Sequence, residues 1–110
     1  KSQQVDVWPG AMTPTEIVKA WKAGANAVKV FPMASLGLSY LKEIRAPLDH
    51  IPMIATGGVT MDNVRDFFQA GAIGVGVGSS LLNRKHISER NFAALAAQAA
   101  ALVEKAHMLD

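Results

Sequence analysis

Short apolar runs alternate along the chain with segments in which apolar residues recur every three or four positions. Runs of valine, isoleucine and alanine bounded by glycine or proline are typical of strands covered on both faces, and the longer spacing is typical of amphipathic helices. The pattern predicts strands at residues 5–8, 26–32, 52–56 and 73–77. It predicts helices at residues 14–23, 39–46, 60–70 and 88–107. This β-α-β-α-β-α-β-α order indicates a parallel sheet with right-handed crossovers.

The start of the first predicted helix carries two independent signals. Thr13 and Glu16 have the spacing of a capping box, in which each side chain satisfies a backbone N–H of the first turn. Pro14 stands at the first helical position, where its missing N–H costs nothing. Gly24 is placed to end the helix. The boundaries of this helix are therefore predicted from local chemistry alone.

An internal repeat relates the two halves of the chain. An offset of 47 residues (71 − 24) pairs Gly24 with Gly71. The same offset pairs Gly10 with Gly57, Thr13 with Thr60, Ile17 with Val64, Trp21 with Phe68, Val28 with Val75 and Val30 with Val77. A βαβα unit thus occurs twice. Since a TIM (β/α)8 barrel typically needs about 250 residues, four βα units would make half of one. An open sheet is the alternative, but closure would remove the exposed edges, and we favour the half barrel.

Composition excludes several classes of function. The chain has 110 residues, of which 50% are hydrophobic, and a net charge of +2 with scattered basic residues, so we expect no nucleic-acid partner. It has no cysteine, which excludes disulfides and thiolate metal sites and is compatible with the cytoplasm. No apolar run reaches a membrane-spanning length. Because the chain begins with Lys1 and enters a strand-like run at once, we interpret it as a fragment or a processed product of a longer chain.

Lys29 is the unusual residue of the second predicted strand. Side chains alternate along a strand, so Lys29 shares a face with Ala27 and Phe31, while Val28 and Val30 point the other way. In an interior lined by apolar groups an ammonium is costly, and a neutral amine can attack a carbonyl to form a Schiff base. The alternative is that Lys29 extends to water near a strand end. From the strand alone, the alternative is favoured.

Two glycine-rich segments follow predicted strands. Gly57 and Gly58 end the third strand, and Gly78 and Ser79 end the fourth. In parallel α/β barrels ligands bind at these carboxyl ends, and backbone N–H groups of glycine turns approach phosphate closely. Tight turns and close packing would also explain the glycines. Two such turns beside an interior lysine favour a phosphate site.

Other polar and aromatic residues do not complete a catalytic set. The carboxylates at predicted helix starts, Glu16, Asp62 and Glu89, suit the helix dipole, and no carboxylate is predicted at a strand end near Lys29. A Schiff-base enzyme needs a proton acceptor, and the chain therefore lacks an evident one. The histidines lack metal-ligand spacing. Aromatic residues at strand or helix spacing are interpreted as core: Trp8, Trp21, Phe67, Phe68 and Phe92.

Taken in order, the motifs resemble a known family. The resemblance is carried by Pro9-Gly10, Thr13-Pro14-Thr15-Glu16, Val28-Lys29-Val30-Phe31-Pro32, Thr56-Gly57-Gly58-Val59 and Gly76-Val77-Gly78-Ser79. These segments are similar to the C-terminal half of the KDPG/KHG aldolases, which act on 2-keto-3-deoxy-6-phosphogluconate (KDPG) and 4-hydroxy-2-oxoglutarate. The resemblance implies that residues 1–110 are the C-terminal half of a single (β/α)8 barrel domain. It also implies a cytoplasmic homo-oligomer, commonly a trimer, without metal or other cofactor.

The resemblance implies roles for seven residues. Lys29 would be the catalytic Schiff-base lysine, which reverses the interpretation from the strand alone. The substrate-binding residues would be Phe31 and Thr56 at the pyruvyl group and Gly57, Gly58, Gly78 and Ser79 at the phosphate. The reaction would be that of a class I aldolase, which releases pyruvate with glyceraldehyde 3-phosphate or glyoxylate. The small-molecule substrate would be a phosphorylated keto acid, and no membrane partner is expected.

The chain departs from the family pattern after Phe31-Pro32. A small residue and a Gly-Gly pair are usual there, whereas this chain has Met33 and Leu36-Gly37-Leu38, which we expect to narrow or reshape the pocket. The family's glutamate and carboxylate-binding arginine belong to the other half of the barrel. Two alternatives remain open: a phosphate-binding barrel of another class, such as an epimerase or synthase, and a non-catalytic half-barrel fragment.

Overall fold

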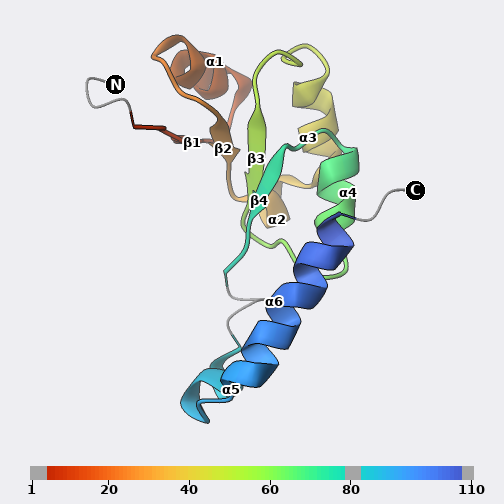
Figure 1. Cartoon of the computed structure of the whole chain (residues 1–110). Helices are drawn as coiled ribbons and strands as arrows, with labels where there is room; N and C mark the ends of the chain where they lie inside the picture. The colour runs from red at the N-terminus through yellow and green to blue at the C-terminus, as the bar shows by residue number, and fades with distance from the viewer. Residues whose placement is uncertain (1–4, 79–82, 108–110) are drawn as a thin grey trace.

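The computed structural model describes residues 5–78 and 83–107, which form one parallel sheet with helices packed on it. The four strands lie in chain order, β1-β2-β3-β4, and every neighbouring pair is parallel (Figure 1). The elements are β1 (Gly10–Ala11), α1 (Pro14–Lys22), β2 (Val28–Val30), α2 (Met33–Leu36), α3 (Leu38–Arg45), β3 (Met53–Thr56), α4 (Val64–Gln69), β4 (Gly74–Gly76), α5 (Arg84–Ser88) and α6 (Phe92–Ala106). The predicted alternation of strands and helices is confirmed.

The first helix has the caps that its sequence predicts. The Thr13 side chain accepts a hydrogen bond from the Glu16 amide, and the Glu16 carboxylate accepts one from the Thr13 amide. Pro14 is the first residue of α1. After the helix Gly24 has φ +104°, and Gly71 after α4 has φ +110°, a region that favours glycine. The shared conformation of these two glycines agrees with the 47-residue repeat.

One predicted strand is displaced. Residues 5–8 are not a strand, and β1 begins at Gly10. Two hydrogen bonds join Val7 to Asn26. The Val7 amide donates to the Asn26 side chain at 2.9 Å, and the Val7 carbonyl accepts from the Asn26 backbone amide at 3.0 Å. The backbone ladder with β2 starts only at the Pro9 carbonyl, which accepts from the Lys29 amide at 2.8 Å. The Val7 amide is thus bonded by a side chain 19 residues away, a contact that the local pattern does not reveal.

The C-terminal helix also differs from its prediction. Instead of one helix over residues 88–107, α5 ends at Ser88 and α6 begins at Phe92. Between them Arg90 has φ +53°, and the Asn91 side chain accepts a hydrogen bond from the Ala94 amide as a new N-cap. The polar residues of this segment therefore end one helix and start another.

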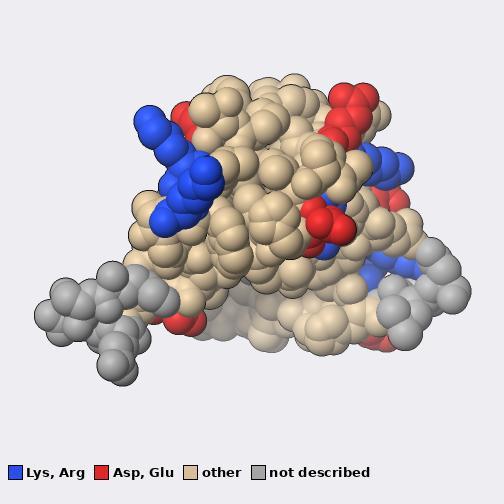
Figure 2. All heavy atoms as spheres, turned by 90° about the horizontal axis from the view of Figure 1, so that it is seen from above, with Lys and Arg blue, Asp and Glu red and all other residues tan. Residues whose placement is uncertain are grey.

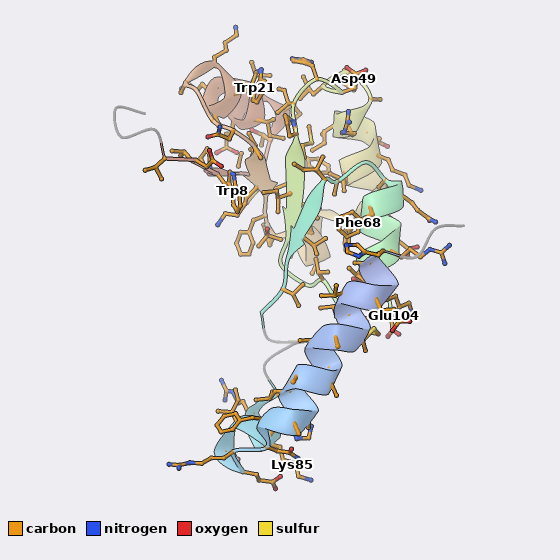
Figure 3. All side chains as sticks on the ribbon, in the orientation of Figure 1. Trp8, Trp21, Asp49, Phe68, Lys85 and Glu104 are labelled. Carbon is orange, nitrogen blue, oxygen red and sulfur yellow. The ribbon has the colours of Figure 1, made fainter. Side chains whose placement is uncertain are left out.

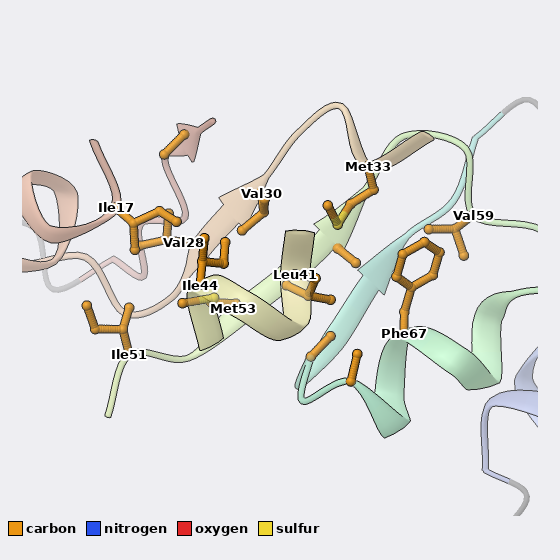
Figure 4. Packing of buried hydrophobic residues seen from close by; sticks show 14 of the residues in the cluster. Ile17, Val28, Val30, Met33, Leu41, Ile44, Ile51, Met53, Val59 and Phe67 are labelled. Carbon is orange, nitrogen blue, oxygen red and sulfur yellow. The ribbon is translucent and has the colours of Figure 1, made fainter. Parts of the chain in front are cut away.

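The core lies between the helices and one face of the sheet. Val28 and Val30 of β2 are fully buried, as are Met53 and Ala55 of β3. Helix side chains cover this face, as Figure 4 shows for Ile17, Leu41, Ile44 and Phe67. Each fully buried Val, Leu or Ile side chain contributes about 1.5–3 kcal/mol.

The opposite face of the sheet is less covered. Lys29 of β2 is half-buried and Phe31, directly after the strand, is 52% exposed. The outer segment α5–α6 extends away from the sheet in Figure 1, and the radius of gyration is 15.3 Å, compared with about 13 Å for a compact chain of this length. Four parallel βα units with helices on one face and an open second face are the arrangement of half a (β/α)8 barrel.

Charged side chains are dispersed. Figure 2, seen from above, shows Lys and Arg side chains interspersed with Asp and Glu around a broad uncharged surface. The ion pair between His50 and Asp49 is long, at 4.0 Å, and both side chains are largely exposed. No helix among the described residues is long and apolar enough to cross a membrane.

Candidate functional site

Lys29 lies in the middle of the open face, in a row that includes two glycines. Its register partner in β1 is Gly10 and its partner in β3 is Ile54, which in turn pairs with Gly74 of β4. A side chain at Gly10 would meet no atom within 4 Å. Because Gly10 in β1 and Gly74 in β4 lack side chains, this row carries only the side chains of Lys29 and Ile54 on the open face.

A second row lies nearer the carboxyl ends of the strands. Thr56 of β3 pairs with Gly76 of β4, and a Cβ on Gly76 would come within 3.0 Å of the Thr56 hydroxyl. That hydroxyl oxygen is buried and has no hydrogen-bond partner among the described residues. A buried hydroxyl without a partner is costly, so its position beside a cavity favours a polar ligand.

These rows border a cavity of about 500 Å³ on the open face. This volume is within the range of small-molecule sites. The described residues that line it are Trp8, Lys29, Phe31, Ile54, Thr56, Gly57, Gly58, Val59, Val75, Gly76, Val77 and Gly78. Six of the seven residues predicted for the site thus line one cavity, and the seventh, Ser79, lies outside the described residues.

The first glycine turn has a structural role as well. Gly57 has φ +92° and Gly58 has φ +79°. A Cβ on Gly58 would collide with the Ala34 side chain, and a Cβ on Gly57 would come within 3.0 Å of the Phe31 ring. The turn is held by the Ala34 amide, which donates to the Gly57 carbonyl, and by the Asn63 side-chain amide, which donates to the Gly58 carbonyl at 2.9 Å. Both readings of these glycines, tight packing and phosphate binding, are therefore compatible with their geometry.

Gly78 has no comparable packing role. A side chain there would meet nothing within 4 Å, and its φ is outside the left-handed region. Packing therefore explains the glycine at position 58 but not the glycine at position 78.

Two sequence interpretations need correction at this site. Trp8 was predicted to be core, but its side chain is 55% exposed and lines the cavity (Figure 3). Residues two apart in a strand share a face, so Trp8 is expected on the same face as Gly10. This spacing was the sequence signal for the position of Trp8. Met33 was expected to narrow or reshape the pocket, but it is 1% exposed, begins α2 and packs in the core.

No carboxylate lies among the described lining residues of the cavity. The structure places Glu16 at the N-terminus of α1, where it accepts hydrogen bonds from the Met12 amide, the Thr13 amide and the Thr13 hydroxyl. The two amides, and then the hydroxyl, hold the pKa of Glu16 below its ordinary value. Across residues 5–78 and 83–107 no group of three or more His, Asp or Glu side chains could hold a metal ion.

Comparison with known proteins places the chain in a family. The model of the aldolase family "KDPG and KHG aldolase" matches residues 1–98. The chain belongs to the KDPG and KHG aldolase family. Within this family, the 2-dehydro-3-deoxy-6-phosphogalactonate aldolase of Escherichia coli (strain K12) is 41% identical over 99 residues, which cover 89% of this chain and 46% of that protein.

Similarity in structure agrees with the family assignment. The solved structure called "Native KDPGal structure" superposes with a TM-score of 0.82 at 39% identity, over 94% of this chain and 49% of that one. A second likeness, which covers less of the chain, is to thiamine-phosphate synthases. That of Methanoculleus marisnigri is 44% identical over 81 residues, which cover 64% of this chain and 38% of that protein. The chain spans about half the length of the curated relatives that it matches.

Proposed function

We propose that Lys29 is the Schiff-base lysine of a class I aldolase and that the described cavity binds a phosphorylated 2-keto-3-deoxy sugar acid. The observation that carries the proposal is the shared cavity. It brings the amine of Lys29, the unpartnered hydroxyl of Thr56 and the strand-end glycines 57, 58 and 78 to one open face. Membership in the KDPG and KHG aldolase family supports the reaction type.

The proposed chemistry begins with the uncharged amine of Lys29. It adds to the C2 carbonyl of the keto acid, and the resulting carbinolamine takes up a proton and loses water to leave an iminium ion. A base then takes the proton of the C4 hydroxyl, the C3–C4 bond breaks, and its electron pair forms an enamine that neutralises the iminium charge. The aldehyde fragment, glyceraldehyde 3-phosphate, leaves. Protonation at C3 restores the iminium ion, and water releases pyruvate and the free amine.

The residues at the cavity can be given roles in this scheme. The glycine turns after β3 and β4 would hold the phosphate through backbone N–H groups. Thr56 would hydrogen-bond the substrate near the imine, which would satisfy its buried hydroxyl. Phe31, half-exposed at the end of β2, would cover the pyruvyl group.

The proton acceptor is proposed to come from outside these residues. The described lining contains no carboxylate, and the chain corresponds to about half of its relatives. We therefore propose that residues 1–110 are the C-terminal half of a barrel domain, whose other half supplies a glutamate base and an arginine for the substrate carboxylate. The resemblance also supports a cytoplasmic homo-oligomer, a trimer, that needs no cofactor.

A second candidate is a phosphate-binding barrel of another class. The likeness to thiamine-phosphate synthases favours it, because the glycine turns would then bind a phosphate ester while Lys29 only contributes positive charge. The same protein could not then form a covalent adduct through Lys29. This difference separates the two candidates.

The test is reduction with borohydride in the presence of pyruvate, followed by mass analysis of peptides. We expect an adduct on Lys29, its loss in Lys29→Arg, and its retention in Lys22→Arg, which changes an exposed lysine of α1. Lys29→Arg keeps the positive charge but removes the nucleophile. If the folded protein gives no adduct on Lys29, the aldolase proposal is wrong and the second candidate stands.

A further inference from the structure

The backbone of Met12 is held by side chains from two different helices. Its amide donates to the Glu16 carboxylate of α1 at 3.0 Å, and its carbonyl accepts from the Tyr40 hydroxyl of α3 at 2.8 Å. The bond to Glu16 belongs to the start of α1, where the same carboxylate accepts from the Thr13 amide. The bond from Tyr40 has no such local origin, because it joins residues 28 apart in the sequence. The proposed reaction gives Tyr40 no role.

Met12 directly follows β1 at the carboxyl edge of the sheet. β1 ends at Ala11, and the Ala11 carbonyl accepts from the Phe31 amide at 3.1 Å. Two consecutive carbonyls, those of Ala11 and Met12, therefore bond to Phe31 and Tyr40. Phe31 is the residue proposed above to cover the pyruvyl group.

These two bonds tie both ends of residues 31–40 to the exit of β1. Within this segment Met33 is buried in the core, and Gly37, with φ +90°, separates α2 from α3. The segment also contains the residues in which the chain departs from the family pattern. The bond from the Tyr40 hydroxyl thus limits how far the start of α3 can move from the exit of β1.

The position of the Phe31 ring depends on its backbone. The ring lines the cavity together with Lys29, and a Cβ on Gly57 would come within 3.0 Å of ring atoms. The side chain is nevertheless half-exposed, so side-chain packing holds it only in part. The bond from its amide to the Ala11 carbonyl supplies a further restraint.

We infer that Tyr40 is a positioning residue that keeps Phe31 in place through its bond to the Met12 carbonyl. The inference rests on the proposed function, since it needs a keto acid on Lys29. A wall that is held in place before the ligand arrives does not have to be ordered on binding, and this preorganisation favours affinity. Loss of the Tyr40 hydroxyl would then weaken binding of the pyruvyl group.

A merely structural role for Tyr40 has a different consequence. Loss of the hydroxyl would then lower the stability of the protein, but the folded protein would bind pyruvate as before. The pyruvate concentration that gives half of the maximal Lys29 adduct is therefore the decisive quantity. It is measured under conditions in which circular dichroism shows each variant to be folded.

The experiment is borohydride trapping on the purified protein over a range of pyruvate concentrations, with the Lys29 adduct read from peptide masses. Tyr40→Phe removes the hydroxyl and keeps the ring, which packs against the core. Ser88→Ala is the matched control, because the Ser88 hydroxyl also donates to a backbone carbonyl, that of Lys85, at 3.0 Å. This bond lies in α5, at the end of α6 that is remote from the sheet (Figure 1).

A second measurement follows the backbone directly. Amide hydrogen exchange by NMR compares the Phe31 amide, which bonds to Ala11, with the Lys29 amide, which bonds to Pro9 further from the exit of β1. In Tyr40→Phe the Phe31 amide should exchange faster relative to the Lys29 amide. This measurement needs no substrate, so it tests the restraint on Phe31 independently of the aldolase chemistry.

We expect the half-saturating pyruvate concentration to rise roughly two- to tenfold in Tyr40→Phe, the range that loss of one hydrogen bond allows, with the maximal adduct yield unchanged. Ser88→Ala should change neither the concentration nor the exchange ratio. If Tyr40→Phe forms the adduct but lacks either change, the inference is wrong and the proposed function stands. Absence of any Lys29 adduct in the unsubstituted protein would overturn both.

Discussion

Replacing Gly58 by alanine tests the packing of the first glycine turn. Two costs add at this position. A φ of +79° places an L-residue in the left-handed region, which costs about 1–2 kcal/mol. The new methyl group would also collide with the side chain of Ala34 in α2. Overpacking of this kind costs about 1–3 kcal/mol. We therefore expect Gly58→Ala to lower the free energy of unfolding by about 2–5 kcal/mol.

Two matched variants separate the costs. Gly24→Ala has the backbone cost alone, because Gly24 has φ +104° and a Cβ there would meet nothing within 4 Å. Gly10→Ala has neither cost, since its φ is outside the left-handed region and its surroundings are equally open. The free energies of unfolding come from urea denaturation followed by circular dichroism, with the slopes compared among variants. If Gly58→Ala is no less stable than Gly24→Ala, the contact with Ala34 does not limit this position and the packing argument is wrong.

Two further predictions concern charge. Hydrogen bonds from the Met12 and Thr13 amides and the Thr13 hydroxyl lower the pKa of Glu16, so its stabilising contribution is fully present above the ordinary value of 4.5 and is lost as the pH falls through the lowered folded value. The stability difference between the unsubstituted protein and Glu16→Gln, measured by thermal unfolding, should be constant from pH 7 to about pH 5 and shrink at lower pH; a difference that grows on acidification would contradict this. Gly78→Asp adds a carboxylate where a side chain meets nothing, and it should raise the Kd for inorganic phosphate roughly tenfold by like-charge repulsion without loss of stability. Gly78→Ala is its control, and equal affinity of the two variants by calorimetry would argue against phosphate at this turn.

Much of the fold follows from interactions between near neighbours in the sequence. The capping box joins residues three apart, and Gly24 and Gly71 end their helices because glycine tolerates a positive φ. Alternation within β2 and β3 predicts which side chains face the helices, since the period of a strand is set by the backbone. The order of elements, the parallel sheet and the grouping of Lys29 with the strand-end glycines were predicted on this basis.

Contacts between distant segments decided the remainder. β1 begins at Gly10 rather than in residues 5–8, and the Val7 amide bonds instead to the side chain of Asn26, 19 residues away. The alanine that makes Gly58 intolerant of a side chain lies in α2, a helix that the apolar pattern did not predict. Trp8 has the composition and spacing of a core residue, and only the sheet register shows that it faces the cavity beside Lys29. Local chemistry determines the elements and their ends, whereas the neighbours of each side chain depend on how those elements pair and pack.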